Sequence, residues 1–130
     1  MHNLLLTSNL AFILPVGAAL AKGYVFVALS LTMMAMSSYI YHMDHSCKTA
    51  HVLDVVVAMI TFLFMSVLTL STGSAWLGSF AMAFAVIGIS LFFDVGNYDD
   101  EMFCVTHSLW HICMAMCSAV GVAALKSGVA

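Results

Sequence analysis

Four ionisable residues lie inside long apolar runs of the sequence: His42, Asp54, His107 and His111. Ionisable side chains are costly to bury in apolar surroundings, so each of the four is a candidate functional residue. His107 and His111 are four positions apart and therefore share one face of a helix. Two imidazoles at this spacing can bind one metal ion, and His42 from a facing helix would provide a third nitrogen ligand.

Three protein ligands leave the fourth position of a tetrahedral site open to water, which is typical of catalytic rather than structural zinc. Imidazole ligands beside a carboxylate suit zinc, and iron and copper remain open as alternatives. Ser38 precedes His42 by four positions and shares its helix face, so it joins Asp54 as a candidate catalytic residue. His45 and His51 are near this region and are open as extra or alternative ligands.

Each of these residues also has a structural interpretation. Paired histidines in an apolar helix can simply hydrogen-bond to a neighbouring helix, and Ser38 can bond to a backbone carbonyl of its own helix. The metal interpretation gains weight because His42 and Asp54 are expected at the same depth as the histidine pair.

The composition identifies the surroundings of these residues. Of the 130 residues, 64% are hydrophobic and 7% are charged, and the formal net charge is -3. A soluble domain has about 25% charged residues, so a soluble globular fold is excluded. The chain contains no Arg, and this charge pattern also excludes a disordered chain and a nucleic-acid partner. The composition therefore indicates an integral membrane protein.

Five apolar runs of the sequence are long enough to cross a bilayer, which takes about 20 residues per helix. None of them shows the alternation of a membrane β-strand. We therefore predict an all-α helical bundle that forms a single domain over residues 1–130, with helices of about Asn3–Ala21, Tyr24–Met43, His51–Ser71, Ala75–Phe93 and Phe103–Leu125. Pro15 is expected to loosen or kink the first helix.

The direction of the chain brings the candidate residues together. In an up-and-down bundle the second helix ends, and the third and fifth begin, on the same side of the membrane. His42 is at the end of the second helix, Asp54 is one turn into the third, and His107 and His111 are one and two turns into the fifth. All four are therefore predicted within about two turns of one membrane surface.

The lysines indicate the orientation, because cytosolic loops are enriched in positive charge. Lys22 and Lys126 fall on one side of the predicted bundle, and Lys48 falls on the other. This difference favours an N-terminus that is outside or luminal and a cytosolic C-terminus.

The order of these motifs resembles the CREST superfamily of membrane hydrolases, which includes alkaline ceramidases, adiponectin-receptor-like proteins and the Per1 proteins of GPI-anchor remodelling. The matching residues are Ser38-Tyr-Ile-Tyr-His42, an Asp in the next helix and His107-Ser-Leu-Trp-His111. Within it, the sequence is similar to the branch of myomaker and the post-GPI-attachment phospholipase (transmembrane protein 8), through Asn9-Leu-Ala-Phe-Ile-Leu-Pro15, Ala21-Lys22, Asn97-Tyr98 and Thr106 to His111. The resemblance covers about residues 9–71 and 97–119.

The resemblance implies a zinc ion held by His42, His107 and His111, with Ser38 and Asp54 contacting the metal-bound water or the scissile carbonyl. It also implies a shortened version of a seven-helix fold, in which a pair of helices is missing before the last one. Because an even number is missing, the site still assembles on one side of the membrane.

Three functions are open at this point. The first is a zinc-dependent intramembrane hydrolase of a lipid acyl ester or amide, with Asp54 as general base and Ser38 orienting water or the developing oxyanion. The alternative is a non-catalytic, myomaker-like membrane-remodelling protein whose zinc only braces the bundle. The third is a haem protein with His42 and a last-helix histidine as axial ligands.

For the hydrolase, a membrane lipid is the expected substrate and would enter sideways from the bilayer. A homo-oligomer would supply the helices that five alone lack.

Overall fold

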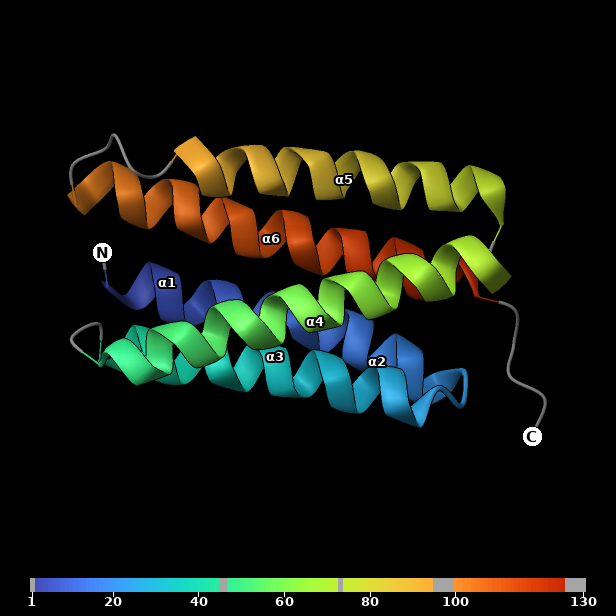
Figure 1. Cartoon of the computed structure of the whole chain (residues 1–130), viewed down its shortest axis with the longest axis horizontal. Helices are drawn as coiled ribbons and strands as arrows, with labels where there is room; N and C mark the ends of the chain where they lie inside the picture. The colour runs from blue at the N-terminus through green and yellow to red at the C-terminus, as the bar shows by residue number, and fades with distance from the viewer. Residues whose placement is uncertain (1, 45–46, 73, 95–99, 126–130) are drawn as a thin grey trace.

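The computed structural model describes residues 2–44, 47–72, 74–94 and 100–125, and nearly all of them are helical. The expected all-α bundle is confirmed, since these residues form five helical rods and contain no strand. In chain order the elements are α1 (His2–Ser8), the 3-10 helix η1 (Asn9–Phe12), α2 (Ile13–Ala21), α3 (Val25–Met43), α4 (Lys48–Thr72), α5 (Ala75–Asp94) and α6 (Asp100–Ala124), as labelled in Figure 1.

The first rod consists of α1, η1 and α2, joined without a break in helical backbone. Its middle tightens into the 3-10 turn of η1, which ends three residues before Pro15. Pro15 has no backbone N–H, so it cannot bond to the carbonyl of Ala11 as an α-helix requires, and its ring crowds that carbonyl. The predicted loosening of this helix at Pro15 is therefore seen as a change of helix type.

The turn after α2 is made by a glycine in a left-handed conformation. Gly23 has φ +80°. Its N–H donates to the carbonyl of Leu20 at 3.0 Å, and the N–H of Tyr24 donates to the carbonyl of Ala19 at 2.9 Å. This pair of bonds is the Schellman motif, which satisfies the last carbonyls of a helix and reverses the chain. The short turn lets α3 run back along α2.

Lys22, in the same turn, reaches the far end of the chain. Its Nζ donates to the backbone carbonyls of Val122, Ala123 and Leu125 at 3.0, 2.8 and 2.7 Å. The last carbonyls of a helix have no partner within the helix and carry the negative end of its dipole. Lys22 therefore caps α6 and joins the first turn of the chain to the last helix.

Two helices begin earlier than the apolar runs indicate. We predicted starts near His51 and Phe103, whereas α4 begins at Lys48 and α6 begins at Asp100. A helix begins where its backbone hydrogen bonds begin, and polar residues are common in the first turn. The apolar run alone therefore underestimates both helices at the end where the polar residues gather.

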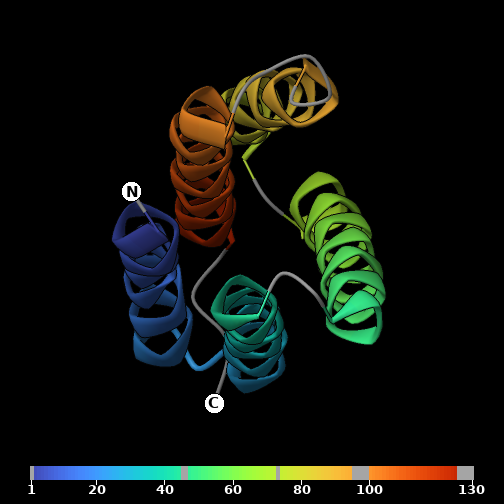
Figure 2. The same ribbon diagram turned by 90° about the vertical axis from the view of Figure 1, so that its left-hand side faces the viewer.

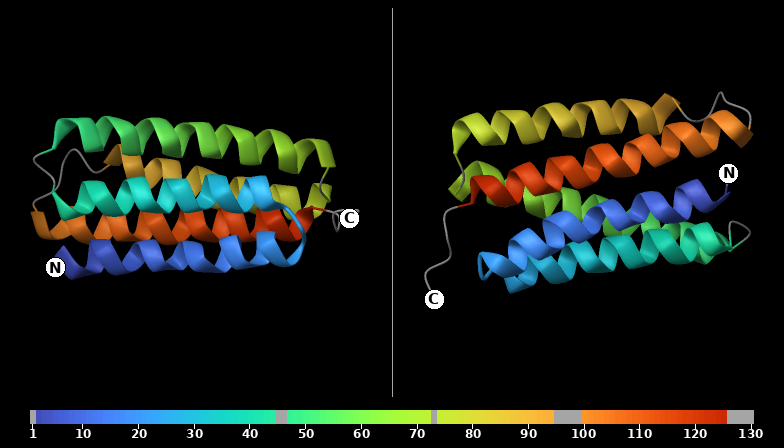
Figure 3. Two further views of the ribbon diagram at one scale, coloured as in Figure 1. Left: turned by 90° about the horizontal axis from the view of Figure 1, so that it is seen from below. Right: turned by 180° about the vertical axis from the view of Figure 1, so that it is seen from behind.

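Successive rods run in opposite directions, as Figure 1 shows. Viewed from the end, they are arranged in the order first rod, α3, α4, α5 and α6, with α6 returning beside the first rod (Figure 2). The two views in Figure 3 show α5 lying along α6. The start of α1, the end of α3 and the starts of α4 and α6 therefore meet at one end of the bundle.

The outer surface of the bundle is strongly apolar. Four segments are long and apolar enough to span a membrane: Leu4–Ala21, Val25–Met43, Lys48–Ser71 and Met102–Ala124. α5 has 20 residues. Among the described residues, its apolar part is the stretch Ala75–Ile87, which is shorter than the other four apolar segments. Large side chains such as Phe26, Leu70 and Trp76 are exposed on the outside, where lipid rather than water suits them. These helices indicate a multi-pass membrane protein.

The buried core is built mainly from small and flexible apolar residues. Its members are Leu31, Met34, Met65, Met114, Ala19, Val27, Ala28, Ala115, Val122 and Phe12. The buried residues of α5 include Gly78, Ala81 and Ala85. Small residues let membrane helices approach closely. The van der Waals contacts that result stabilise helix association in lipid, where the hydrophobic effect does not.

Candidate metal centre

Three imidazoles meet at the end of the bundle where α3 ends and α6 begins. His42 and His111 have no exposed surface, and His107 is 6% exposed. The ring centroids are 4.9 Å apart for His42 and His107, 5.1 Å for His42 and His111, and 4.8 Å for His107 and His111. One nitrogen from each ring lies within 4.8 Å of the other two, so the group could hold a metal ion.

The local sequence explains how these rings are held. His107 and His111 stand one turn apart on α6, and His42 faces them from the last turn of α3. The ring of Phe103 stacks on His107 with centroids 5.2 Å apart, and Trp110 lies 5.1 Å from both histidines of α6. These aromatic contacts restrict ring rotation and exclude water from one side of the group.

Both ring nitrogens of His111 have close polar neighbours. Its Nε2 lies 3.1 Å from the Ser38 hydroxyl and 3.4 Å from the Nε2 of His42. Its Nδ1 lies 2.7 Å from the hydroxyl of Ser8 on α1. Three helical rods therefore converge on one imidazole, and the predicted neighbour Ser38 is in direct contact with it.

Asp54 is buried one and a half turns into α4 and is 4% exposed. Its Oδ1 accepts a hydrogen bond from the hydroxyl of Ser37 at 3.3 Å. Ser37 also donates, at 3.0 Å, to the carbonyl of Met34, so one hydroxyl is shared between two acceptors. A buried carboxylate with so few hydrogen bonds is costly, which is typical of a functional rather than a structural position.

A cavity of about 480 Å³ connects Asp54 with the histidine group. Both Asp54 and His107 line it, and most of its other lining side chains are apolar. Met59 and Leu63 of α4 and Ile89 of α5 line it and are also exposed on the outer surface. The cavity therefore reaches the bilayer-facing surface of the bundle between α4 and α5. This size and lining are typical of a site for a small apolar ligand.

Of the two alternative ligands, the structure describes His51, which is not a member of the group of three. His51 is exposed, lies against Tyr41 with ring centroids 4.8 Å apart and ring planes tilted by 48°, and lines the large cavity. His45 lies outside the residues that the structure describes. Among the described residues, the metal group consists of His42, His107 and His111.

Two contact residues were not singled out from the sequence, namely Ser8 and Ser37. Ser8 lies in the first predicted helix, Asn3–Ala21, and Ser37 is adjacent to Ser38, which shares the helix face of His42. A usable signal for Ser8 is its place beside Asn9 inside an apolar run, since polar residues within a membrane helix face the protein interior. For Ser37, the sequence offers no comparable signal.

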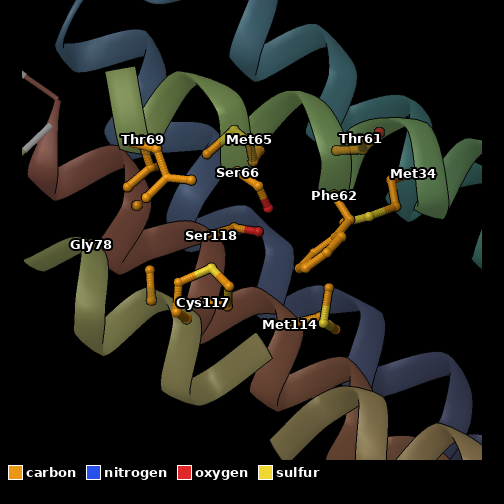
Figure 4. A pocket seen from close by; sticks show the side chains of 14 residues that line it. Met34, Thr61, Phe62, Met65, Ser66, Thr69, Gly78, Met114, Cys117 and Ser118 are labelled. Atoms are coloured by element: carbon orange, nitrogen blue, oxygen red, sulfur yellow. The ribbon is translucent and has the colours of Figure 1, made fainter. Parts of the chain in front are cut away.

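A second cavity, of about 20 Å³, lies farther along the bundle. Figure 4 shows the side chains of Ser66 on α4 and Ser118 on α6 pointing toward one another, with Met65 and Met114 nearby. Its volume suits about one water molecule. Its lining contains no carboxylate and no imidazole among the described residues, so acid–base chemistry belongs to the larger cavity.

Comparison of the chain with protein-family models, with curated proteins and with solved structures found no match. The chemistry of the site is therefore inferred from its donor atoms and from the cavity beside them.

Proposed function

We propose that the protein is a zinc-dependent intramembrane hydrolase of a lipid acyl ester or amide. The observation that carries this proposal is a buried three-histidine group at the wall of an apolar cavity that also contains Asp54. Two nitrogens bound to one tetrahedral zinc ion at about 2.0–2.1 Å lie about 3.4 Å from each other. The Nε2 atoms of His42 and His111 are 3.4 Å apart, which matches this spacing, and the donor atoms of all three imidazoles lie within 4.8 Å of one another.

A bound zinc ion supplies a Lewis acid that polarises a carbonyl and acidifies water. The protein's own residues would do the rest. The Asp54 carboxylate would take the proton of the attacking water and return it to the leaving oxygen or nitrogen. The Ser38 hydroxyl, beside the Nε2 of His111, would donate a hydrogen bond to the developing oxyanion.

The cavity supports a lipid as substrate. Its lining is mostly apolar, apart from a few polar groups that include Asp54 and His107. A lipid chain placed there would have its carbonyl at the polar end and its tail among the side chains of Ala58, Phe62 and Met114. Entry from the bilayer between α4 and α5 needs no passage through water.

The motif resemblance to the CREST superfamily supports the same proposal through the residues that it shares, Ser38, His42, Asp54, His107 and His111. We also propose an orientation with the site on the outside or luminal side, because Lys22 belongs to the opposite end of the bundle.

The alternative proposal is a non-catalytic zinc site. The three histidines lie on α3 and α6, so a zinc ion bound to them would link the two helices and stabilise the bundle. The two proposals differ in one measurement. Purified, zinc-loaded protein in lipid nanodiscs is given phospholipid esters and ceramide amides, and released fatty acid is quantified. Release that Asp54→Asn abolishes, with zinc content unchanged, supports the hydrolase. Stoichiometric zinc without release from any of these lipids supports the bracing site, and protein that binds no zinc contradicts both.

A further inference from the structure

The hydroxyl of Ser8 has one hydrogen and two close partners. Its Oγ lies 2.8 Å from the carbonyl oxygen of Leu5 and 2.7 Å from the Nδ1 of His111. A carbonyl oxygen can only accept, so the hydroxyl hydrogen belongs to the bond with Leu5. The Oγ lone pairs then remain for His111, and both contacts are satisfied only if Nδ1 carries a hydrogen and donates it.

The consequence for His111 concerns its other nitrogen. A neutral imidazole carries one ring hydrogen, so a hydrogen on Nδ1 leaves Nε2 with a free lone pair. Nε2 is the nitrogen that faces the Nε2 of His42 at 3.4 Å and the hydroxyl of Ser38 at 3.1 Å. The lone pair therefore lies on the side of the ring that faces Ser38 and His42.

We infer that Ser8 is a positioning residue that holds His111 as the tautomer with hydrogen on Nδ1, so that Nε2 is ready to bind metal. Ser8 would touch neither the metal nor the substrate. The metal-binding part of this inference rests on the proposed function, and the tautomer part does not. Histidines that bind metal through one ring nitrogen commonly donate a hydrogen bond from the N–H of the other. Losing the acceptor of that bond weakens metal binding by about 10–100-fold.

The surrounding structure keeps Ser8 in place. Ser8 is buried at the junction of α1 and η1, where the carbonyl of Leu5 also accepts the side-chain amide of Asn9 at 3.2 Å. α1 packs against α6, so the first rod contributes this hydroxyl to the site. The neighbouring residue Thr7 makes the same kind of bond to Leu4 at 3.1 Å and is exposed. Thr7 is therefore a matched control.

The first test uses metal-free, ¹⁵N-histidine-labelled protein in detergent at a pH where His111 is neutral. Two-bond ¹H–¹⁵N correlations show which ring nitrogen carries the hydrogen, and His111→Gln identifies the His111 signals among the 6 histidines. We expect hydrogen on Nδ1 in the wild type and in Thr7→Ala, and a mixture or the other tautomer in Ser8→Ala. Hydrogen on Nε2 in the wild type overturns the inference.

The second test measures Co²⁺ affinity from its visible absorption, with Zn²⁺ in competition. We expect Ser8→Ala to bind about 10–100-fold more weakly, Thr7→Ala to equal the wild type, and Ser8→Thr to recover most of the affinity because it keeps the hydroxyl. If Ser8→Ala shows wild-type affinity, the role of Ser8 in metal binding is refuted. If the wild type binds neither metal, the proposed function fails, and the tautomer measurement alone judges Ser8.

Discussion

The Nε2 atoms of His42 and His111 lie 3.4 Å apart, although the two residues are 69 positions apart in the chain. Neither ring has exposed surface. At this distance one Nε2–H can donate to the lone pair of the other Nε2, or both lone pairs can bind one cation. The bundle therefore brings together two donor atoms that a metal ion could share, and the consequences of removing each part can be measured.

Replacing His42 or His111 by Ala should remove the metal and also lower thermal stability. Metal that binds only the folded state adds about 2.7 kcal/mol when its free concentration is 100-fold above Kd. Metal content is measured by mass spectrometry and stability by thermal unfolding, each with and without a chelator. Cys104→Ala is the control: the half-buried Cys104 thiol is free and lies outside the three-histidine group, so both values should stay unchanged. Full metal content in His42→Ala would contradict the ligand assignment.

Asp54→Asn should separate chemistry from metal binding. The amide keeps the size of the side chain and can still pair with the Ser37 hydroxyl, but it cannot take a proton. We expect unchanged zinc content and fatty-acid release lower by about 10²–10⁴-fold, as is typical when a general base is lost. Loss of zinc in this variant would instead make Asp54 a ligand.

Ser38→Ala should have a smaller effect than Asp54→Asn. A neutral hydrogen bond contributes about 1 kcal/mol, so we expect release to fall by about tenfold at most, with the zinc content of the wild type. Steady-state kinetics should place the loss in kcat rather than KM, because the hydroxyl acts on charge that develops during the reaction. An effect confined to KM would show that Ser38 binds the substrate instead.

Ala58→Phe should obstruct the large cavity without touching the histidines. Ala58 lines the cavity on α4, one turn after Asp54, and a phenyl ring there would occupy space proposed for the lipid chain. We expect unchanged zinc content and kcat/KM lower by about tenfold, which corresponds to about 1.4 kcal/mol. Ala83→Phe, on the exposed side of α5, is the matched control and should behave as the wild type. Equal kinetics for the two variants would place the lipid elsewhere.

Two glycines should respond to alanine with opposite signs. At both Gly17 and Gly23 an added Cβ meets nothing within 4 Å. Gly17 is helical, so Gly17→Ala should raise the free energy of unfolding by about 0.5–1 kcal/mol. Gly23 has φ +80°, so Gly23→Ala should lower it by about 1–2 kcal/mol. Unfolding in SDS titrations measures both changes, and a loss of stability in both variants would contradict the conformational explanation.

The sequence predicted the bundle and the meeting of the four ionisable residues from two simple properties. The apolar runs give the number of helices and their approximate positions, and alternating helix direction brings the end of α3 and the starts of α4 and α6 to one end of the bundle. No side-chain detail was needed for this, because His42, Asp54, His107 and His111 all lie within about three turns of the helix ends that meet there.

The contacts within the site could not be predicted in the same way. Ser8 meets His111 only because α1 packs beside α6, an arrangement that depends on how five rods close around the core. Ser37 and Ser38 are adjacent, and the sequence does not show that Ser37 bonds to Asp54 while Ser38 reaches His111. Such partners depend on helix rotation by a fraction of a turn, which a hydrophobic pattern spread around the whole helix does not fix.

The bond between Lys22 and the end of α6 also orders events during synthesis. Lys22 precedes its first acceptor, Val122, by 100 residues. Ribosomes add about 5–20 residues per second, so about 5–20 s pass between the synthesis of the ammonium group and that of its acceptors. During that interval the first two rods lack their tie to the last helix. Assembly of this bundle therefore finishes only after the whole length to α6 has entered the membrane, and a ribosome that stalls before α6 leaves a positive charge without its three carbonyls.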